Sequence, residues 1–126
     1  MTYFAPQLII KVVAPAVDFY QKVFSAKVLR LFKNDDDSIH VAEMEIDGTM
    51  FHIHEESPGS QHLSPETTRA ASVLIGLFVD DVNTIVKLAE ANGASIISPI
   101  TDWEYGYRQC TFKDPFGHQW LIEKKI

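Results

Sequence analysis

Near the C-terminus the chain reads Asp114-Pro115-Phe116-Gly117-His118-Gln119-Trp120-Leu121-Ile122-Glu123. Proline presets one backbone dihedral and glycine accepts a positive φ, so the first four residues predict a tight turn. The residues after the turn alternate in the manner of a β-strand, with Trp120 and Ile122 on one face. The opposite face carries Gln119, Leu121 and Glu123. We therefore expect the apolar face to pack on a core and the mixed face to line a cavity.

The composition is that of an ordinary globular protein. The chain has 126 residues, 46% of them hydrophobic and 22% charged, and a formal net charge of −6. This length suits a single domain, and the absence of a basic stripe argues against a nucleic-acid partner. No apolar run is long enough to span a membrane, and no signal peptide precedes the first strand, so we expect a cytoplasmic protein with no membrane partner. The single cysteine, Cys110, fits a reducing compartment and a packed position in a strand.

The first half of the chain predicts the order strand, helix, strand, strand, strand. The helix opens at Ala14-Pro15, where proline is tolerated in the first turn, and Asp47-Gly48 is a hairpin signal. The acidic run Asp35–Asp37 reads as a solvated hairpin tip. The predicted strands are 8–13, 27–33, 39–46 and 49–54, followed by a polar linker without periodicity over 55–71.

The second half predicts the same order of elements. Asp80 or Asp81 can cap a helix that Asn92-Gly93 ends. The predicted strands are 73–79, 95–98, 108–113 and the stretch after Asp114, and the segment 99–107 is predicted as a loop.

The two halves superimpose at a constant offset of 69 residues, which brings Leu8 onto Leu77, Gly48 onto Gly117 and Phe51 onto Trp120. A two-copy repeat of this length predicts two βαβββ units, about 1–56 and 72–126, within one domain. Neither unit has enough strands to enclose a ligand. The predicted fold class is therefore α+β, with the two units forming a half-open eight-stranded barrel and the helices outside.

These features resemble the glyoxalase/bleomycin-resistance/extradiol-dioxygenase superfamily, also called the vicinal oxygen chelate proteins. The resemblance rests on the paired βαβββ units and on three motifs: Asp18-Phe19-Tyr20, Val79-Asp80-Asp81-Val82 and Asp114-Pro115-Phe116-Gly117-His118. Pro6, Gly106 and Arg108 look most like the PhnB-like branch. His118 is, by this resemblance, a structural part of the turn. The superfamily contains lyases, isomerases, dioxygenases, thiol transferases and drug-binding proteins, so the fold does not settle the activity.

The resemblance also implies where the family's divalent metal would be bound. The four ligand positions correspond to Ala5, His52, Leu74 and Leu121, of which only His52 can bind a metal. Gln7 is the only donor near Ala5. A catalytic transition metal needs about three protein ligands, so we expect no cofactor and no metal at the usual site. A displaced metal held by His52, His54, Glu43 and Glu123 remains an alternative.

The predicted ligand site is a cavity between the two units. Its polar wall includes His52, which can also serve as a catalytic acid or base. Arg108 can bind a carboxylate or phosphate, and the aromatic residues before it can stack on a planar ligand. The full set of predicted ligand-binding residues is Gln7, Met50, His52, His54, Leu74, Trp103, Tyr105, Arg108, Leu121 and Glu123.

Three functions remain open at this stage. The first is metal-free binding of a small organic molecule. The second is a lyase, isomerase or dioxygenase that uses a displaced metal or His52 as a base. The third is a structural or regulatory dimer whose cavity is filled by its own side chains. The resemblance implies a homodimer in all three cases.

Overall fold

The computed structural model describes residues Met1–Ile126, which divide into two compact units, Met1–Thr68 and Arg69–Ile126. Both units have the order βαβββ, so the predicted α+β class and the two predicted repeats are confirmed. The first unit consists of β1 (Gln7–Ile10), α1 (Val13–Phe24), β2 (Lys27–Lys33), β3 (Ile39–Ile46), β4 (Thr49–Glu55) and α2 (Pro65–Thr68). The second consists of β5 (Leu74–Phe78), α3 (Val82–Ala91), β6 (Ser95–Trp103), β7 (Tyr107–Lys113) and β8 (Gln119–Lys125).

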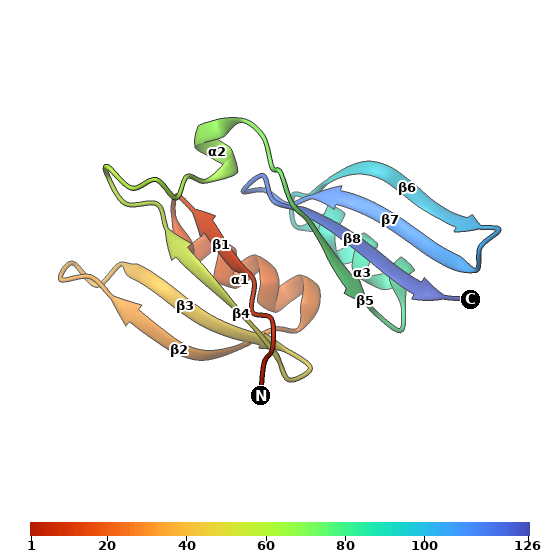
Figure 1. The fold of residues 1–126 in the computed structure, drawn as a ribbon, viewed down its shortest axis with the longest axis horizontal. Helices are drawn as coiled ribbons and strands as arrows, with labels where there is room; N and C mark the ends of the chain where they lie inside the picture. The colour runs from red at the N-terminus through yellow and green to blue at the C-terminus, as the bar shows by residue number, and fades with distance from the viewer. The chain divides into compact units, whose positions relative to one another are not determined.

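Each unit contains one four-stranded mixed sheet. The strand orders are β1-β4-β3-β2 and β5-β8-β7-β6, and in each sheet the first strand runs parallel to its neighbour while the remaining pairs are antiparallel. One helix packs on one face of each sheet, α1 in the first unit and α3 in the second (Figure 1). Each sheet therefore has a helix-covered face and a face without a helix of its own unit, which we call the helix-free face.

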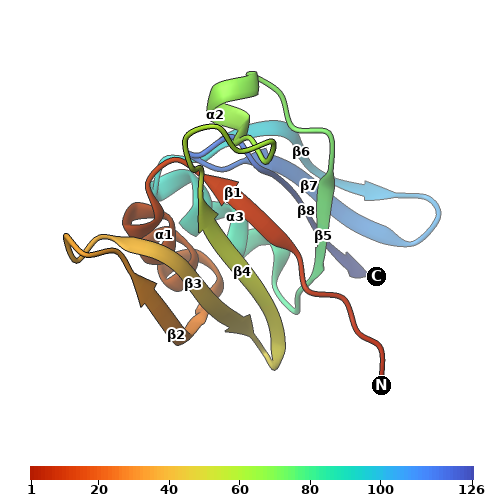
Figure 2. The same cartoon turned by 60° about the vertical axis from the view of Figure 1, so that its left-hand side comes forward.

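The helix-covered face of the first unit holds an aromatic core. Tyr20 of α1 is fully buried, with its ring 5.6 Å from that of Phe51 on β4 and 5.9 Å from that of Phe24. Ile53 and Met44 extend this core across β4 and β3. α1 lies against these two strands (Figure 2). Burying one such side chain contributes about 1.5–3 kcal/mol, so this layer holds α1 on the sheet.

The second unit repeats this arrangement with different side chains. Trp120 and Ile122 of β8 are buried on the face that α3 covers, as the alternation after Asp114 predicts. The Asp81 carboxylate caps α3 by accepting a hydrogen bond from the Thr84 N–H at 3.0 Å. Asp81, rather than Asp80, is therefore the cap, and Gly93 follows the helix with a φ of +98°.

The register of the sheets confirms the offset of 69 in their parallel pairs. Gln7 lies opposite His52 in the first unit, and Gly76 lies opposite Leu121 in the second. In β7 the offset is 68. His54 of the first unit pairs with Val41, and its counterpart in the second unit, Glu123, pairs with Gln109. The β7–β8 hairpin thus has one residue more between paired positions than the β3–β4 hairpin, and its turn covers 114–118 where that of the first unit covers 47–48.

The predicted loop over 99–107 is wrong. β6 continues to Trp103, and only the short turn before Tyr107 separates it from β7. Pro99 caused the error, since proline cannot donate to a sheet ladder. It is tolerated here because β6 is an edge strand whose register shifts between Ser98 and Thr101.

Part of the predicted linker over 55–71 is also ordered. β4 extends to Glu55, and Pro65–Thr68 form the short helix α2, which contacts β1. The Glu56 carboxylate holds this segment by accepting hydrogen bonds from the Ser64 N–H at 2.6 Å and the Thr67 hydroxyl at 2.8 Å. Ser64-Pro65 is a signal for the start of a helix. The prediction missed it because the segment 55–71 has no hydrophobic periodicity. No helix in the structure is long and apolar enough to cross a membrane.

Candidate functional site

The helix-free face of the first unit carries a group of polar side chains. Alternate residues of a strand point to opposite faces, and Phe51 and Ile53 face α1, so the residues between and beside them on β4 face the other way. β1 and β3 add residues to this face through their register with β4. The predicted ligand-binding residues of this unit all lie there: Gln7, Met50, His52 and His54.

Gln7 and His54 form one satisfied pair on this face. The Gln7 Nε2 donates to the Ala5 carbonyl at 3.1 Å, which leaves its Oε1 to pair with His54 Nε2 at 2.7 Å. Partial burial lowers the pKa of His54 below its usual value, and the neighbouring His52 lowers it further. A neutral His54 that donates from Nε2 presents its Nδ1 as a hydrogen-bond acceptor.

His52 is less well satisfied than its neighbour. Its Nε2 is buried without a hydrogen-bond partner, although Glu43 Oε2 lies 3.5 Å away in a geometry too poor for a hydrogen bond. The rings of His52 and His54 stack with their centroids 5.8 Å apart. A buried polar atom without a partner costs about 1–3 kcal/mol, so His52 is kept at a cost to stability.

These donors do not fit the metal that the resemblance implies. Of the four expected positions, Ala5, Leu74 and Leu121 have no donor atom in their side chains. Within each unit, no group of three or more His, Cys, Asp or Glu side chains could hold a metal ion. Glu123, invoked for a displaced metal, belongs to the second unit, whereas Glu43, His52 and His54 belong to the first.

The helix-free face of the second unit carries Leu74, Leu121 and Glu123. Glu123 is 7% exposed, and its Oε1 accepts a hydrogen bond from Gln109 Nε2 at 2.9 Å. Gly76 lies beside it, where a Cβ would come within 3.3 Å of Glu123 Oε2. Gln109 and Gly76 therefore shape this site, although neither was predicted. The signal available in the sequence was the position of Gly76 within an otherwise apolar strand.

An aromatic row lies on the same helix-free face, at the β6–β7 hairpin. Trp103 and Tyr105 stack with ring centroids 6.0 Å apart, and Tyr107 continues the row 5.8 Å from Tyr105. Phe78 of β5 meets Tyr107 edge-on at 5.9 Å. The Tyr105 hydroxyl donates to Gln109 Oε1 at 2.8 Å, which ties the row to the Glu123 site.

Arg108 lies on the opposite face of the same hairpin, since it has the strand parity of the buried Cys110. Its guanidinium binds the Asp102 carboxylate through Nε at 2.7 Å and Nη2 at 3.0 Å, and Nη1 donates to Asn83 at 3.2 Å. This pairing raises the pKa of Arg108 and lowers that of Asp102. Ligand binding by Arg108 stays a prediction, but Arg108 does not share a face with Trp103.

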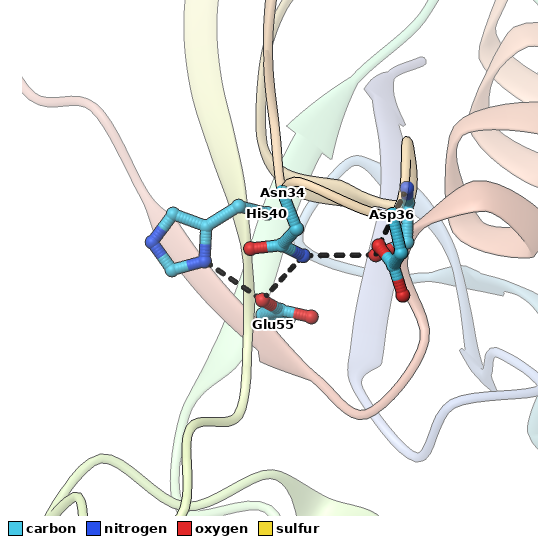
Figure 3. Close-up of polar contacts among 5 residues, drawn as sticks. Asn34, Asp36, His40 and Glu55 are labelled. Atoms are coloured by element: carbon cyan, nitrogen blue, oxygen red, sulfur yellow. Dashed lines mark hydrogen bonds and ion pairs between the residues drawn. The ribbon is translucent and has the colours of Figure 1, made fainter.

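A second polar cluster in the first unit was not predicted (Figure 3). Glu55 Oε1 lies 2.9 Å from His40 Nδ1 and accepts from Asn34 Nδ2 at 2.9 Å. Asn34 also reaches the Ser38 hydroxyl, which donates to Asp36. The hydrogen bond with His40 is the main cause of the lowered pKa of Glu55. The cluster ties the tip of the β2–β3 hairpin to the end of β4, and confirms that the acidic run is a hairpin tip.

A groove of about 430 Å³ adjoins this cluster. It lies beside the start of α1, and Glu55 is part of its wall. Lys11 and Lys33 are balanced by Asp37 and Glu55, so the charge of the groove selects neither anions nor cations. The rest of the lining is Val12, Val13, Ala14, Leu31, Ser38 and Ile39.

Comparison with known proteins gives a consistent family. Residues 3–122 match the sequence profile of the Glyoxalase/Bleomycin resistance protein/Dioxygenase superfamily. An uncharacterised protein of Mycobacterium tuberculosis is 29% identical over 125 residues, which cover 97% of this chain and 74% of that protein.

Two solved structures illustrate the likeness of fold. TioX from Micromonospora sp. ML1 has a TM-score of 0.76 at 22% identity, with 100% of both chains covered. The fosfomycin resistance protein FosX from Listeria monocytogenes has a TM-score of 0.74 at 16% identity, with 100% of this chain and 94% of that chain covered. At these identities the likeness shows the fold alone.

Proposed function

The chain belongs to the Glyoxalase/Bleomycin resistance protein/Dioxygenase superfamily, and we propose that it binds a small organic molecule on its helix-free sheet faces without the family's metal centre. The main observation behind the proposal is that every predicted ligand-binding residue except Arg108 lies on one of these two faces. The face of the first unit holds a histidine nitrogen without a partner, and the face of the second unit holds exposed aromatic rings. Ligand sites typically combine polar groups with apolar and aromatic surface.

His52 is the strongest support for this proposal. A side chain with a buried, unpartnered nitrogen lowers stability, and a leucine occupies the equivalent position of the second unit. A ligand that hydrogen-bonds to the imidazole, or shifts it towards Glu43, would recover part of this cost. His54 Nδ1 offers a second acceptor about 6–7 Å further along the same strand face.

The test is a thermal-shift screen of small metabolites and antibiotics, with and without divalent metals. A ligand at 100 times its Kd stabilises a protein by about 2.7 kcal/mol, an effect well within the range of this measurement. We expect ligands that act in the presence of a chelator and lose at least about tenfold in affinity when His52 is replaced by Ala. Stabilisation that requires a stoichiometric transition metal would refute the metal-free site, and an empty screen would refute the binding function.

A second candidate is an enzyme in which His52 acts as a metal-free base. The specific observation is the His52–Glu43 pair, since a carboxylate 3.5 Å from Nε2 favours a proton on that nitrogen and leaves Nδ1 to accept one. For any substrate that the screen supplies, His52→Ala would then abolish turnover while Glu43→Gln would reduce it. Turnover that survives His52→Ala would exclude this role.

Within the superfamily we place the chain nearest to the PhnB-like branch, on Pro6, Gly106, Arg108 and the turn at Asp114. We also propose that it is a homodimer, as the resemblance implies. Light scattering after size-exclusion chromatography would report about twice the 14.2 kDa of one chain if this is correct. A mass of one chain at micromolar concentration would contradict it.

A further inference from the structure

We infer that the helix-free face of the second unit recognises a protonated amine carried on an apolar or aromatic body, with Glu123 as the anionic partner. This inference rests on the proposed binding function and names the chemical class of the ligand. It involves side chains of the second unit alone, and its parts are a buried carboxylate, a glycine and the aromatic row.

Glu123 is a carboxylate whose hydrogen bonding is incomplete. Only 7% of the residue is exposed, and Oε1 alone receives a hydrogen bond, from the neutral amide of Gln109. No cationic side chain lies within 4.0 Å of it: Lys124 Nζ donates to the Asp80 carbonyl, and Lys125, on the same face, makes no ion pair with it. Burying a carboxylate without a cation is costly, so Glu123 favours a ligand that supplies positive charge.

Gly76 leaves room for the Glu123 carboxylate. A Cβ at this position would approach Glu123 Oε2 to 3.3 Å, which is tighter than ordinary contact. Because residue 76 has no side chain, the Glu123 carboxylate can lie over its backbone with Oε2, the oxygen that has no partner, next to it. The first unit fills the equivalent place with Gln7, whose Oε1 is bonded to His54. At this position of the fold, the first unit thus has two side chains that are hydrogen-bonded to each other, and the second unit has a carboxylate oxygen without a partner.

The aromatic row supplies the apolar half of the site. Phe78 lies opposite Glu123 in the register of β5 with β8, and Tyr107 touches Phe78. Phe78, Trp103 and Tyr105 are 58%, 47% and 62% exposed, so their faces are available to a ligand. Ring faces attract ammonium groups and stack on planar bodies. A bound amine would therefore meet a carboxylate and π-faces together, whereas an anion would meet the uncompensated charge of Glu123.

The test compares three probes of matched shape: phenethylamine, the neutral 2-phenylethanol and the anionic phenylacetate. A hydrogen bond to a charged group is stronger than one between neutral groups, so we expect the amine to bind at least about tenfold more tightly than the alcohol. Glu123→Gln keeps the shape and removes the charge, and should reduce this preference to less than about threefold. Glu90→Gln, on the exposed side of α3, removes the same charge elsewhere and should leave the preference unchanged.

Gly76→Ala provides a second variant that retains every charge. Its Cβ should displace the carboxylate and weaken binding of the amine more than binding of the alcohol, provided that circular dichroism shows a native fold. Equal binding of the three probes, stronger binding of phenylacetate, or an amine preference that survives Glu123→Gln would each overturn the inference. Any of these results would leave the proposed binding function intact, because neutral ligands could still bind. Failure of every compound in the thermal-shift screen would refute both the binding function and the amine preference.

Discussion

The two units keep the same core and differ on the opposite face. On the helix-covered side, Phe51 and Ile53 of the first unit correspond to Trp120 and Ile122 of the second, and all four are buried. On the helix-free side, Gln7, His52 and His54 correspond to Gly76, Leu121 and Glu123. The helix-covered side must exclude water for the unit to fold, so it tolerates only apolar exchange. The helix-free side has no such constraint, and it is where the chemistry diverges.

The turn before β4 and the turn before β8 also differ between the two units. Asp47-Gly48 is an exposed two-residue hairpin with a φ of +47° at Asp47. Asp114 is buried in the longer turn of the second unit, where it accepts hydrogen bonds from the Phe116 N–H, the His118 N–H and the Trp120 indole. The second turn is therefore bound to the core by a side chain, and the first is held by backbone geometry alone.

The largest effect that tests this contrast is expected for Asp114→Asn. The amide nitrogen cannot accept a hydrogen bond, so at least one of the three donors loses its acceptor, at a cost of about 2–3 kcal/mol in the free energy of unfolding. Asp47→Asn is the matched control and should change stability by less than about 0.5 kcal/mol, because asparagine also tolerates a positive φ. Urea denaturation measures both variants, and equal losses would show that the turns are equivalent.

A smaller effect is expected when the first unit is made to resemble the second through His52→Leu. The substitution removes the unpartnered Nε2 and adds an apolar group, so the free energy of unfolding should stay the same or rise by about 1 kcal/mol. Binding of any ligand that depends on His52 should be lost at the same time. A loss of stability above about 1 kcal/mol would mean that the imidazole makes a stabilising interaction, and would weaken the case for a ligand at this position.

The smallest effect concerns the pH dependence of stability. The pKa of His54 is lowered in the folded chain, so between that value and the unfolded pKa near 6.5 the unfolded state binds more protons. Stability should therefore be greatest above pH 6.5 and should fall as the pH decreases through this window. His54→Gln should flatten the slope of Tm between pH 7.5 and about 5.5. An unchanged slope, or an NMR titration of His54 above 6.5, would contradict the stated environment.

Regular features of the fold were predictable because they depend on local patterns. The strand 39–46 begins and ends where alternation predicts, and α3 begins beside its predicted cap. The strand predicted over 8–13 is too long, because β1 ends at Ile10 and α1 begins at Val13. Two larger errors fall where a tertiary contact overrides a local signal. Pro99 lies within β6 because an edge strand tolerates it, and α2 forms in a polar segment because Glu56 holds Ser64 and Thr67.

The candidate site was predictable in part for the same reason. The period of a strand places His52 and His54 on one face, so their proximity follows from the sequence. The hydrogen bond that occupies Gln7, the ion pair of Arg108 with Asp102, and the placement of Gly76 against Glu123 all depend on neighbouring strands. The first and third of these contacts join residues distant in the chain, and the second joins residues that face each other across the β6–β7 hairpin. Local periodicity carries no information about any of them.

The sequence by itself determined that this chain folds as two βαβββ units and that only one of four expected metal-ligand positions has a donor. The first follows from residue type and spacing, and the second from the resemblance to the superfamily. Only the tertiary structure decided which polar groups are satisfied: His54 is paired, His52 Nε2 is buried without a partner, and Glu123 is bonded at one oxygen. The reason is physical, since hydrogen bonding and burial depend on distances between strands, and these exist only once the sheet has formed.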